Sequence, residues 1–466
     1  MPLCGMTIFH ISRIRKAGFP SAAYAKYCTS QNVKCVFGKT MVTYKYRNFV
    51  KKLQFHWKKD GNKIYIMDKI IFHIDVNSAY LSWSTLDKLQ HGSATDLRTI
   101  PAIIGGDMAK RHGVVLAKSI PAKAYGIMTG EPIVNAMRKC PGLLIEPPNH
   151  SLYHERSREL MQLLSDISPD IEQVSVDECY LDYTSIKRLF PTPIDAADHI
   201  RAQVLEKLGF TVNIGISDRK VLAKMASDFQ KPNLTHTLYS YEIKEKMWPL
   251  PVSSLFMCGH SSMESLQKLG ILTIGDLAGT DVAILTSHLK SHGKLLWEYA
   301  NGIDESVVEI TQAVEKSIGS STTLPKDAVT TGEAQHVLLE LAESVARRLR
   351  SSGQMAEMIS IEIKYNTFKK VSHQTTLLQP TSGSDTIYRT ACTLLDELWD
   401  GTPIRLLGIR SSKLISDEEP IQLNLFDLSK KEASLEKALD SIRQKYGADA
   451  VVRGSLLRHK PEKSET

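Results

Sequence analysis

The chain has 466 residues, of which 42% are hydrophobic and 23% are charged. This composition is typical of a soluble globular protein, and the length exceeds what one compact core organises, so we expect three or four domains. No apolar run approaches the 18 residues of a membrane-spanning helix, so we expect no membrane partner. The cysteines contain no C-x-x-C pair, which favours a reducing compartment and argues against a structural zinc site. They are Cys4, Cys28, Cys35, Cys140, Cys179, Cys258 and Cys392.

The net charge of +7 is distributed unevenly along the chain. Residues 1–66 hold 13 Lys and Arg against one acidic residue, Asp60, whereas the remaining 400 residues hold 45 basic and 50 acidic groups. The bulk charge of the main body therefore does not indicate nucleic-acid binding. Such binding has to be argued from local sites.

The basic segment 1–66 has three possible interpretations. It could be a transit peptide, although its aromatic residues and its length fit that class poorly. It could be a basic arm that binds nucleic acid. We favour the third interpretation, an extension upstream of a working start at Met67, because a new domain pattern begins there. Within the segment, Asp60-Gly61 between two aromatic-containing runs predicts a β-hairpin.

From Lys69 onward, apolar runs alternate with amphipathic helical patterns. The predicted elements are a strand at 69–77, a helix at 78–90, short strands and turns at 99–148, a helix at 151–168, a strand at 171–184, a helix at 195–209 and a strand at 210–217. This β-α-β-β-α-β alternation predicts an α/β core with helices packed on one sheet. Residues 241–305 are predicted to form small helical units, and residues 315–414 strands with two helices, at 332–351 and 386–398.

Acidic residues interrupt two of the predicted strands. Asp75 lies near the end of the strand at 69–77, and Asp177 and Glu178 lie side by side in the run IEQVSVDECYLDYT (171–184). Two like charges about 4 Å apart repel by roughly 4 kcal/mol at an effective dielectric constant near 20. Divalent cations such as Mg²⁺ would remove this repulsion, and three carboxylates from two neighbouring strands suit them. Because strand residues alternate between faces, the chain must turn or bulge at Asp177 and Glu178. The alternative is that Asp177 is a strand-end acid paired with a lysine.

The chain resembles the Y-family translesion DNA polymerases, the DNA polymerase IV and UmuC-like group, in three blocks. These are HIDVNSAYLSW (73–83), VSVDECYLDYT (174–184) and NIGISDRKVLAKMASDFQKPN (213–233). Their order and separation also match, and the resemblance covers residues 67 to about 426. It implies a multidomain α/β (α+β) protein with the right-hand polymerase fold. The implied parts are a ferredoxin-like palm (67–98 and 149–240), small fingers (99–148), a helix-hairpin-helix thumb (241–305), an α/β little finger (315–415) and a tail (416–466).

The resemblance also implies the roles of individual residues. Asp75, Asp177 and Glu178 would be catalytic carboxylates that bind two Mg²⁺ ions, with Val76 contributing its backbone carbonyl. Tyr80 falls where the family keeps an aromatic steric gate, a ring that leaves no room for a 2′-hydroxyl on the incoming nucleotide.

Two lysines would contact the triphosphate of that nucleotide. They are Lys220, in SDRKVLAK, and Lys123, in SIPAKAYG. A cation at such a position offsets the charge that develops during phosphoryl transfer. Without the resemblance, each lysine would more readily be a solvated surface charge.

The chain departs from the family pattern at two places. Ile120 stands where the family commonly has a tyrosine that bonds the phosphates, so that contact is missing or comes from Ser119 or the backbone. In the thumb, FMCGHSSMESLQKLGI keeps only Gly259 of the usual Pro-Gly-Val-Gly hairpin, which makes close approach to the DNA backbone less assured. In the little finger, Arg347, Arg348 and Arg350 on one helix are candidates for contact with the DNA backbone.

The tail contains a short apolar run, IQLNLFDL (421–428). It resembles the peptide by which bacterial polymerases bind the sliding clamp, through Gln422, Leu423, Leu425 and Phe426. A short peptide with a few apolar anchors suits a preformed pocket. The alternative is a last short strand of the preceding domain.

The implied function is translesion synthesis by a DNA-directed DNA polymerase. Its partners would be primed DNA, dNTP and the clamp, and its location the bacterial cytoplasm, in association with the nucleoid. A second hypothesis is a catalytically weak accessory protein that binds DNA and the clamp and keeps the same fold. A third is another palm-type nucleotidyl transferase such as a cyclase, which would leave the thumb and little finger unexplained.

Overall fold

The structure is a computed structural model, and it falls into two units that are described separately. One unit comprises residues 1–77 and 157–310, and the other residues 78–156 and 311–466. Residues 69–106, 113–311, 315–418, 435–447 and 450–454 are described in full. For 429–434 and for the five strands within 24–66, only the backbone is described. The predicted clamp peptide, residues 421–428, lies outside the described residues.

The first unit is built on a five-stranded sheet in the order β10-β11-β6-β12-β13. The strands are β6 (Ile71–Val76), β10 (Ile171–Gln173), β11 (Glu178–Asp182), β12 (Val212–Ser217) and β13 (Thr235–Thr237). The first four pair antiparallel, and β13 joins the edge in parallel. By chain order β12-β6-β11-β10 is 4-1-3-2, the ferredoxin-like arrangement that the β-α-β-β-α-β pattern predicts.

The predicted strand at 171–184 is wrong as a single element. Residues 171–182 instead form a hairpin of β10 and β11, in which the amide N–H groups of Val174 and Ser175 both donate to the carbonyl of Glu178. The run contains no Gly or Pro that would mark the turn. Asp177 lies in the turn and Glu178 opens β11, so the two acids are not neighbours on one flat strand.

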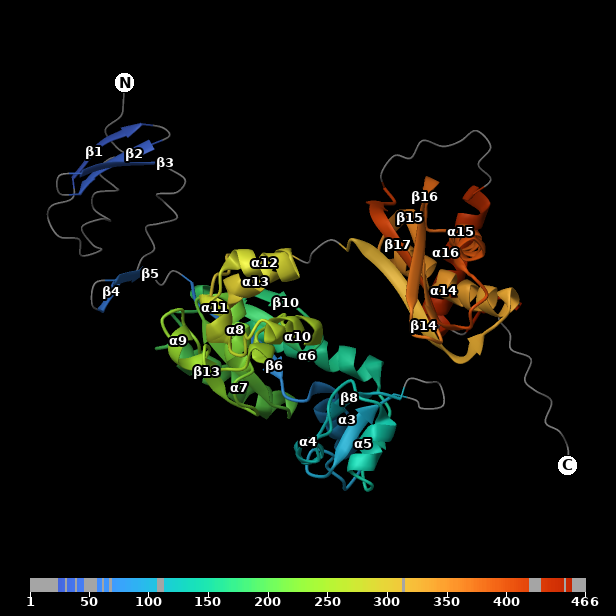
Figure 1. Ribbon diagram of the computed structural model, residues 1–466, viewed down its shortest axis with the longest axis horizontal. Helices are drawn as coiled ribbons and strands as arrows, with labels where there is room; N and C mark the ends of the chain where they lie inside the picture. The colour runs from blue at the N-terminus through green and yellow to red at the C-terminus, as the bar shows by residue number, and fades with distance from the viewer. Residues whose placement is uncertain are drawn as a thin grey trace. The chain divides into compact units, whose positions relative to one another are not determined.

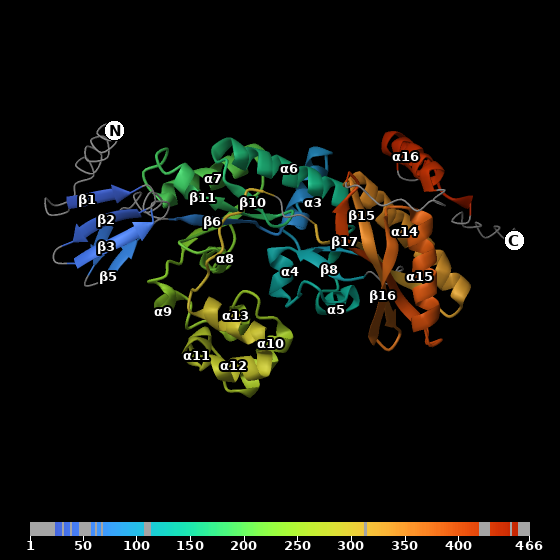
Figure 2. The same cartoon turned by 90° about the horizontal axis from the view of Figure 1, so that it is seen from above.

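Helices lie on both faces of this sheet (Figures 1 and 2). The helices are α6 (His150–Ile167), which begins in the second unit and ends in the first, α7 (Pro193–Leu208) and α8 (Lys220–Ser227). Figure 2 shows α7 on one face of the sheet and α8 on the other. The apolar side of α7 is buried through Ala196, Ala197, Ile200 and Val204.

Gly215 allows α8 to approach β12 closely. A Cβ atom at Gly215 would lie 2.0 Å from the carbonyl oxygen of Ala223 and 2.4 Å from the amide nitrogen of Ser227, both in the backbone of α8. His73 is the register partner of Gly215 on β6, so it lies on the face that α8 covers. Only a residue without a side chain fits this position.

The part of the first unit that follows β13 is mainly helical. The helices are α9 (Ile243–Lys246), α10 (His260–Lys268), α11 (Ile274–Gly279), α12 (Val282–Leu289) and α13 (Ser291–Ala300). Their buried side chains form one core with Val221, Leu222 and Met225 of α8. The small helical units predicted for 241–305 are therefore present, and α8 is shared between this region and the sheet.

The second unit contains a small sheet and a larger one. The small sheet has the order β8-β7-β9 and includes β7 (Ala102–Gly105), β8 (Val115–Lys118) and β9 (Leu144–Glu146), with α3 (Ala79–Gln90), α4 (Ile120–Ala124) and α5 (Ile133–Lys139). The larger has the order β14-β17-β15-β16, made of β14 (Ser317–Ala328), β15 (Gln354–Tyr365), β16 (Lys370–Thr381) and β17 (Ile404–Ser416). Helices α14 (Thr331–Ser351) and α15 (Ser384–Leu398) bury their apolar sides against the larger sheet.

A C-terminal helix, α16 (Ser429–Tyr446), contacts α14 through ion pairs. Arg350 is 8% exposed and is held by Glu436 at 3.0 Å and Asp440 at 2.6 Å. Arg443 and Arg453 both pair with Glu343 of α14. Arg350, a candidate for contact with DNA in the sequence analysis, therefore bonds within the protein instead.

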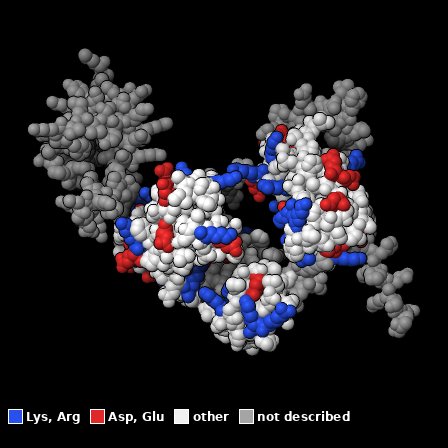
Figure 3. Space-filling model, viewed as in Figure 1, with Lys and Arg blue, Asp and Glu red and all other residues white. Residues whose placement is uncertain are grey.

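The residues of the extension that the structure describes form β1 (Tyr24–Thr29), β2 (Asn32–Phe37) and β3 (Thr40–Lys45) in one sheet and β4 (Trp57–Asp60) and β5 (Lys63–Ile66) in a second. Strands β4 and β5 pair antiparallel around the predicted hairpin position. No helix within the described residues is both long enough and apolar enough to span a membrane. Both charge signs are interspersed on each described part in Figure 3, consistent with the balanced charge of the main body.

The Gly215 contact gives a first prediction. Gly215→Ala should destabilise the protein by about 1–3 kcal/mol, because α8 must shift to relieve a clash with its backbone. Gly279→Ala, in α11, is the matched control: a Cβ there meets nothing within 4 Å. Since Ala is favoured over Gly in helices by about 0.5–1 kcal/mol, the control should be neutral or slightly stabilising. Urea unfolding of both variants measures the difference, and equal midpoints would contradict the argument.

Candidate active site

Asp75 and Glu178 face each other on adjacent strands. They are direct register partners in the antiparallel pair of β6 and β11, and Asn213 of β12 is the partner of Asp75 on the other side. Direct partners on one face have Cβ atoms only about 4.5–5.5 Å apart. The sheet therefore brings two of the three predicted carboxylates together.

Asp177 reaches the same place from the turn. Its carbonyl accepts a hydrogen bond from the amide of Val76 at 3.0 Å, which ties the turn to the end of β6. The Ser175 hydroxyl donates to the Asp177 carboxylate at 2.6 Å. Burial raises the pKa of Asp177, and the charges of Asp75 and Glu178 raise it further against the opposing Ser175 bond. The turn between β10 and β11 supplies the turn or bulge that was predicted from the sequence at Asp177 and Glu178.

Two lysines that the sequence analysis did not single out neutralise these carboxylates. Lys224 of α8 lies 2.6 Å from Oε2 of Glu178 and 3.8 Å from Oδ1 of Asp75. Lys231 pairs with Asp75 and, at 2.9 Å, with Asp228. Lys224 follows Lys220 by one helical turn, so helical spacing was the available signal.

Glu178 is held strongly in its ionised form. The hydrogen bond from His73 and the Lys224 ammonium lower the pKa of Glu178 to about 2, although partial burial opposes them. The distance from His73 Nε2 to Glu178 Oε2 is 3.2 Å. Glu178 is therefore a carboxylate whose charge and position are both fixed by the protein.

Lys220, one of the predicted triphosphate ligands, bonds Glu172 and not the three predicted carboxylates. Its ammonium group is 2.7 Å from both carboxylate oxygens of Glu172 and 4.6 Å from the ring centre of Tyr180. The structure does not pair it with Asp75, Asp177 or Glu178, and Lys224 and Lys231 lie closer to the acids.

The other predicted nucleotide contacts belong to the second unit. The half-buried Tyr80 ring stacks on Tyr153, with ring centres 4.2 Å apart and planes at 8°. Tyr153 is itself buried and shares a hydrogen bond with Ser84 at 2.9 Å, so the Tyr80 ring rests on a fixed support. Lys123 is exposed on α4.

Ile120 stands at the position of the family tyrosine, and the neighbouring Ser119 forms hydrogen bonds within the protein. Ile120 is 61% exposed at the start of α4, preceded by Ser119 as the N-cap. The Ser119 hydroxyl donates to the carbonyl of Ile100 at 2.7 Å and accepts from the amides of Ala102 and Ala122 at 3.1 Å each. Ser119 is thus fully engaged in holding α4 and is not positioned to replace a phosphate ligand.

The donor set suits a hard divalent cation, although it is not arranged as a cage. Within the described ranges, no three His, Cys, Asp or Glu side chains are grouped so as to hold a metal ion. The ammonium groups of Lys224 and Lys231 hold Asp75 and Glu178 instead. Carboxylate oxygens are the ligands that Mg²⁺ prefers, so the residues fit this ion once the ammonium groups move aside.

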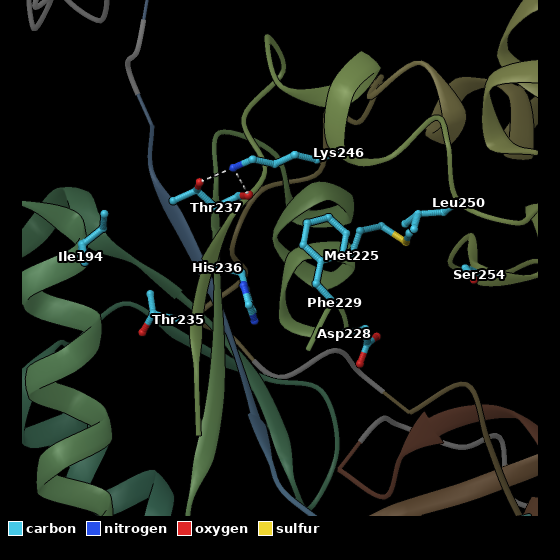
Figure 4. Close-up of a pocket in the computed structure, with 10 residues that line it drawn as sticks. All are labelled: Ile194, Met225, Asp228, Phe229, Thr235, His236, Thr237, Lys246, Leu250 and Ser254. Atoms are coloured by element: carbon cyan, nitrogen blue, oxygen red, sulfur yellow. Dashed lines mark hydrogen bonds between the residues drawn. The ribbon is translucent and has the colours of Figure 1, made fainter. Parts of the chain in front are cut away.

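A pocket of about 590 Å³ lies between the end of α8, β13 and the segment Leu250–Ser254 (Figure 4). Met225, Phe229 and His236 supply apolar and aromatic surface, and Lys246 bonds Thr237 at its edge. None of the sequence-predicted site residues that the structure describes lines this pocket.

Comparisons with known proteins show the family to which the chain belongs. The impB/mucB/samB family matches residues 74–228, and the C-terminal domain of the same family matches residues 315–425. A DNA polymerase IV from Clostridium acetobutylicum is 45% identical over 399 residues, covering 85% of this chain and all of that protein. The chain belongs to the impB/mucB/samB family.

Further members of the family and a solved structure support this assignment. DNA polymerase IV 2 of Bacillus subtilis is 35% identical, covering 84% of this chain and 95% of that protein. A solved Y-family DNA polymerase chimera matches with a TM-score of 0.64 at 22% identity, over 74% of this chain and 99% of the chimera. The identification as a Y-family polymerase and the right-hand polymerase fold are therefore confirmed.

The contacts of Glu178 give a second prediction. Without metal, Glu178→Gln should destabilise the protein at pH 7 by about 1 kcal/mol after allowing for solvent screening, because Lys224 and His73 lose a charged partner. The pKa of Glu178 is lower in the folded state than in the unfolded state. Its contribution is therefore complete above about pH 4.5 and is lost as the pH falls toward 2.

Urea unfolding of wild type and variant over this pH range measures the effect. The difference between the two proteins should shrink as the pH falls. A difference that stays constant or grows on acidification would show that ionised Glu178 is not the stabilising form.

Proposed function

We propose that this chain is a template-directed DNA polymerase that adds deoxynucleotides to a primer 3′-hydroxyl, releases pyrophosphate and acts in translesion synthesis. The observation that carries the proposal is the placement of Asp75 opposite Glu178, with Asp177 tied to the end of β6, on a ferredoxin-like sheet. Its family membership makes it a DNA-directed DNA polymerase, and its relatives bear the name DNA polymerase IV.

Asp75, Asp177, Glu178 and the carbonyl of Val76 would hold two Mg²⁺ ions. Bound there, the ions would lower the barrier to attack on the α-phosphate by neutralising charge on the attacking and leaving oxygens. The protein contributes mostly by positioning these groups and keeping them ionised. The low pKa of Glu178 supports this role, because a ligand of Mg²⁺ must be deprotonated.

Lys224 and Lys231 carry ammonium groups that can change partners during the reaction. Lys224 and Lys231 neutralise the carboxylates in the absence of metal. With divalent cations bound to the carboxylates, Lys224 and Lys231 would be free to bind the polyanionic triphosphate. Lys123 and Lys220 are proposed as further phosphate contacts, and for Lys220 this requires release from Glu172.

Tyr80 is proposed as the steric gate that excludes ribonucleotides. Its stack on the buried Tyr153 supports the role, since a gate discriminates only if its ring cannot move aside. The palm, fingers, thumb, little finger and tail are proposed with the boundaries given above. Binding of a sliding clamp through Gln422, Leu423, Leu425 and Phe426, and a location with the bacterial nucleoid in the cytoplasm, complete the proposal.

A catalytically weak accessory protein with the same fold is the second candidate. The exposed Ile120 in place of the family tyrosine, with Ser119 already engaged, is the observation that favours it. Primer extension with and without Mg²⁺ separates the two candidates, because only the polymerase incorporates dNTP.

The third prediction concerns Asp177. Asp177→Ala should reduce primer extension by at least about 10³-fold, because a group that stabilises the transition state is removed. DNA affinity, measured by fluorescence anisotropy, should stay within about twofold. Glu206→Gln, a change of an exposed acid on α7, is the control and should leave extension unchanged. Retained extension by Asp177→Ala would reject the assigned role.

The fourth prediction concerns Tyr80. Tyr80→Ala should raise ribonucleotide incorporation relative to deoxynucleotide incorporation by about 10–200-fold, the range expected when steric exclusion in a pocket is relieved. Tyr80→Phe keeps the ring and should keep the discrimination. The ratio of kcat/KM for dNTP and rNTP measures the effect, and an unchanged ratio in Tyr80→Ala would rule out the gate.

A further inference from the structure

His73 is a buried polar side chain directly below the carboxylates. It precedes Asp75 by two residues on β6, so both side chains lie on the face that α8 covers, and it is 1% exposed. A polar ring buried to this degree needs partners for both nitrogens. The proposed function does not itself assign His73 any role.

Both ring nitrogens of His73 have a partner. Nδ1 lies 2.8 Å from the hydroxyl of Ser227 on α8, and Nε2 lies 3.2 Å from Oε2 of Glu178. The ring also meets Tyr180 edge to face, with centres 4.8 Å apart. These contacts come from two elements, α8 and β11, that hold the ring from different sides, so it has little freedom to rotate.

The Ser227 anchor is itself held from several sides. Its hydroxyl lies 2.8 Å from the carbonyl of Lys224, and its own carbonyl accepts from the Asn213 side chain at 3.1 Å. Gly215 permits the approach of α8 that brings Ser227 to the ring. The anchor therefore depends on the central packing of the first unit rather than on a mobile surface group.

The chemistry of the contacts assigns the protons. The oxygens of ionised Glu178 only accept hydrogen bonds, so Nε2 of His73 carries the proton and donates. The Ser227 hydroxyl has one proton and two acceptors at 2.8 Å, the carbonyl of Lys224 and Nδ1 of His73. With the ring neutral and protonated on Nε2, that proton goes to Nδ1, because Nδ1 has no other donor in the described part of the chain.

Lys224 and His73 contact the same carboxylate oxygen. Both bonds fall on Oε2, at 2.6 and 3.2 Å, and within the described residues no hydrogen bond is formed to Oε1. Lys224 is a long flexible chain that can leave when a divalent cation arrives. His73 is packed in place and cannot leave.

We propose that His73 is a positioning residue for Glu178: anchored by Ser227, it donates to Oε2 and fixes the carboxylate so that Oε1 is presented to a divalent cation. The inference rests on the proposed metal-binding role of Glu178. Hydrogen bonds to the far side of a ligating group orient it, and their loss typically weakens metal binding about 10–100-fold.

Three substitutions of His73 separate positioning from packing. His73→Gln places an N–H donor near the Nε2 position and so keeps the bond to Glu178. His73→Asn places its amide near the Nδ1 position, where it reaches Ser227 but not Glu178. His73→Phe keeps the ring volume and removes both bonds. Thermal unfolding confirms that each variant is folded.

The first readout is binding of Mn²⁺ alone to the full chain, measured by electron paramagnetic resonance of the free ion. We expect His73→Phe and His73→Asn to weaken Mn²⁺ binding about tenfold, and His73→Gln to stay within about threefold of wild type. Wild-type affinity in His73→Phe would overturn the proposal. A loss in His73→Gln as large as in His73→Phe would also overturn it, because packing alone would then explain the effect.

The second readout is the Mg²⁺ concentration for half-maximal single-turnover primer extension. It should rise in parallel with the Mn²⁺ dissociation constant while DNA affinity stays constant. If wild type itself does not extend primers, the proposed function fails, whereas the His73 inference is still decided by Mn²⁺ binding.

Ser227→Ala tests the proposal independently if the His73 variants do not fold. Removal of the hydroxyl frees the ring on one side and should weaken Mn²⁺ binding about threefold or more. Unchanged Mn²⁺ binding in Ser227→Ala would overturn the anchoring and with it the proposal.

Discussion

The close approach of α8 to β12 at Gly215 is the contact on which the rest of the site depends. Because Gly215 has no side chain, the backbone of α8 at Ala223 and Ser227 lies directly on the sheet. That approach brings Lys224 to Glu178 and Ser227 to His73. A sheet with a bulkier residue at this point would still fold around its apolar face, but its acids would lose the helix that neutralises and orients them.

The electrostatics of the site follow from this packing. The carboxylates of Asp75 and Glu178 face each other, and two ammonium groups and one buried imidazole offset their repulsion. Asp177 is bonded by the Ser175 hydroxyl instead. The pKa values of the adjacent acids Asp177 and Glu178 shift in opposite directions. The pKa of Glu178 falls because Lys224 and His73 bond it, whereas burial raises the pKa of Asp177. The site thus holds acids of unequal basicity within a few residues.

The sequence predicted the regular elements well and the long-range contacts poorly. The strands at 69–77 and 210–217 and the helices at 151–168 and 195–209 are all present, because their apolar periodicity is strong. The hairpin turn at 174–177 was missed because its residues, Val-Ser-Val-Asp, include no Gly or Pro. The roles of His73 and Lys231 could not be predicted, since each depends on a partner more than 100 residues away. Asp177 and Glu178 drew attention as adjacent charges within a predicted strand, and the family resemblance added Asp75 and supplied the predicted metal-binding role of all three.

Helix α8 serves two neighbours at once. One side carries Lys224 and Ser227 toward the sheet, while Val221, Leu222 and Met225 are built into the core of the helical region α9–α13. Any displacement of that region would shift the lysine and the serine as one body. The positions of the acids are therefore coupled to the position of the helical region through α8. A force on that region would change the geometry at the sheet even if none of its residues contacts the nucleotide.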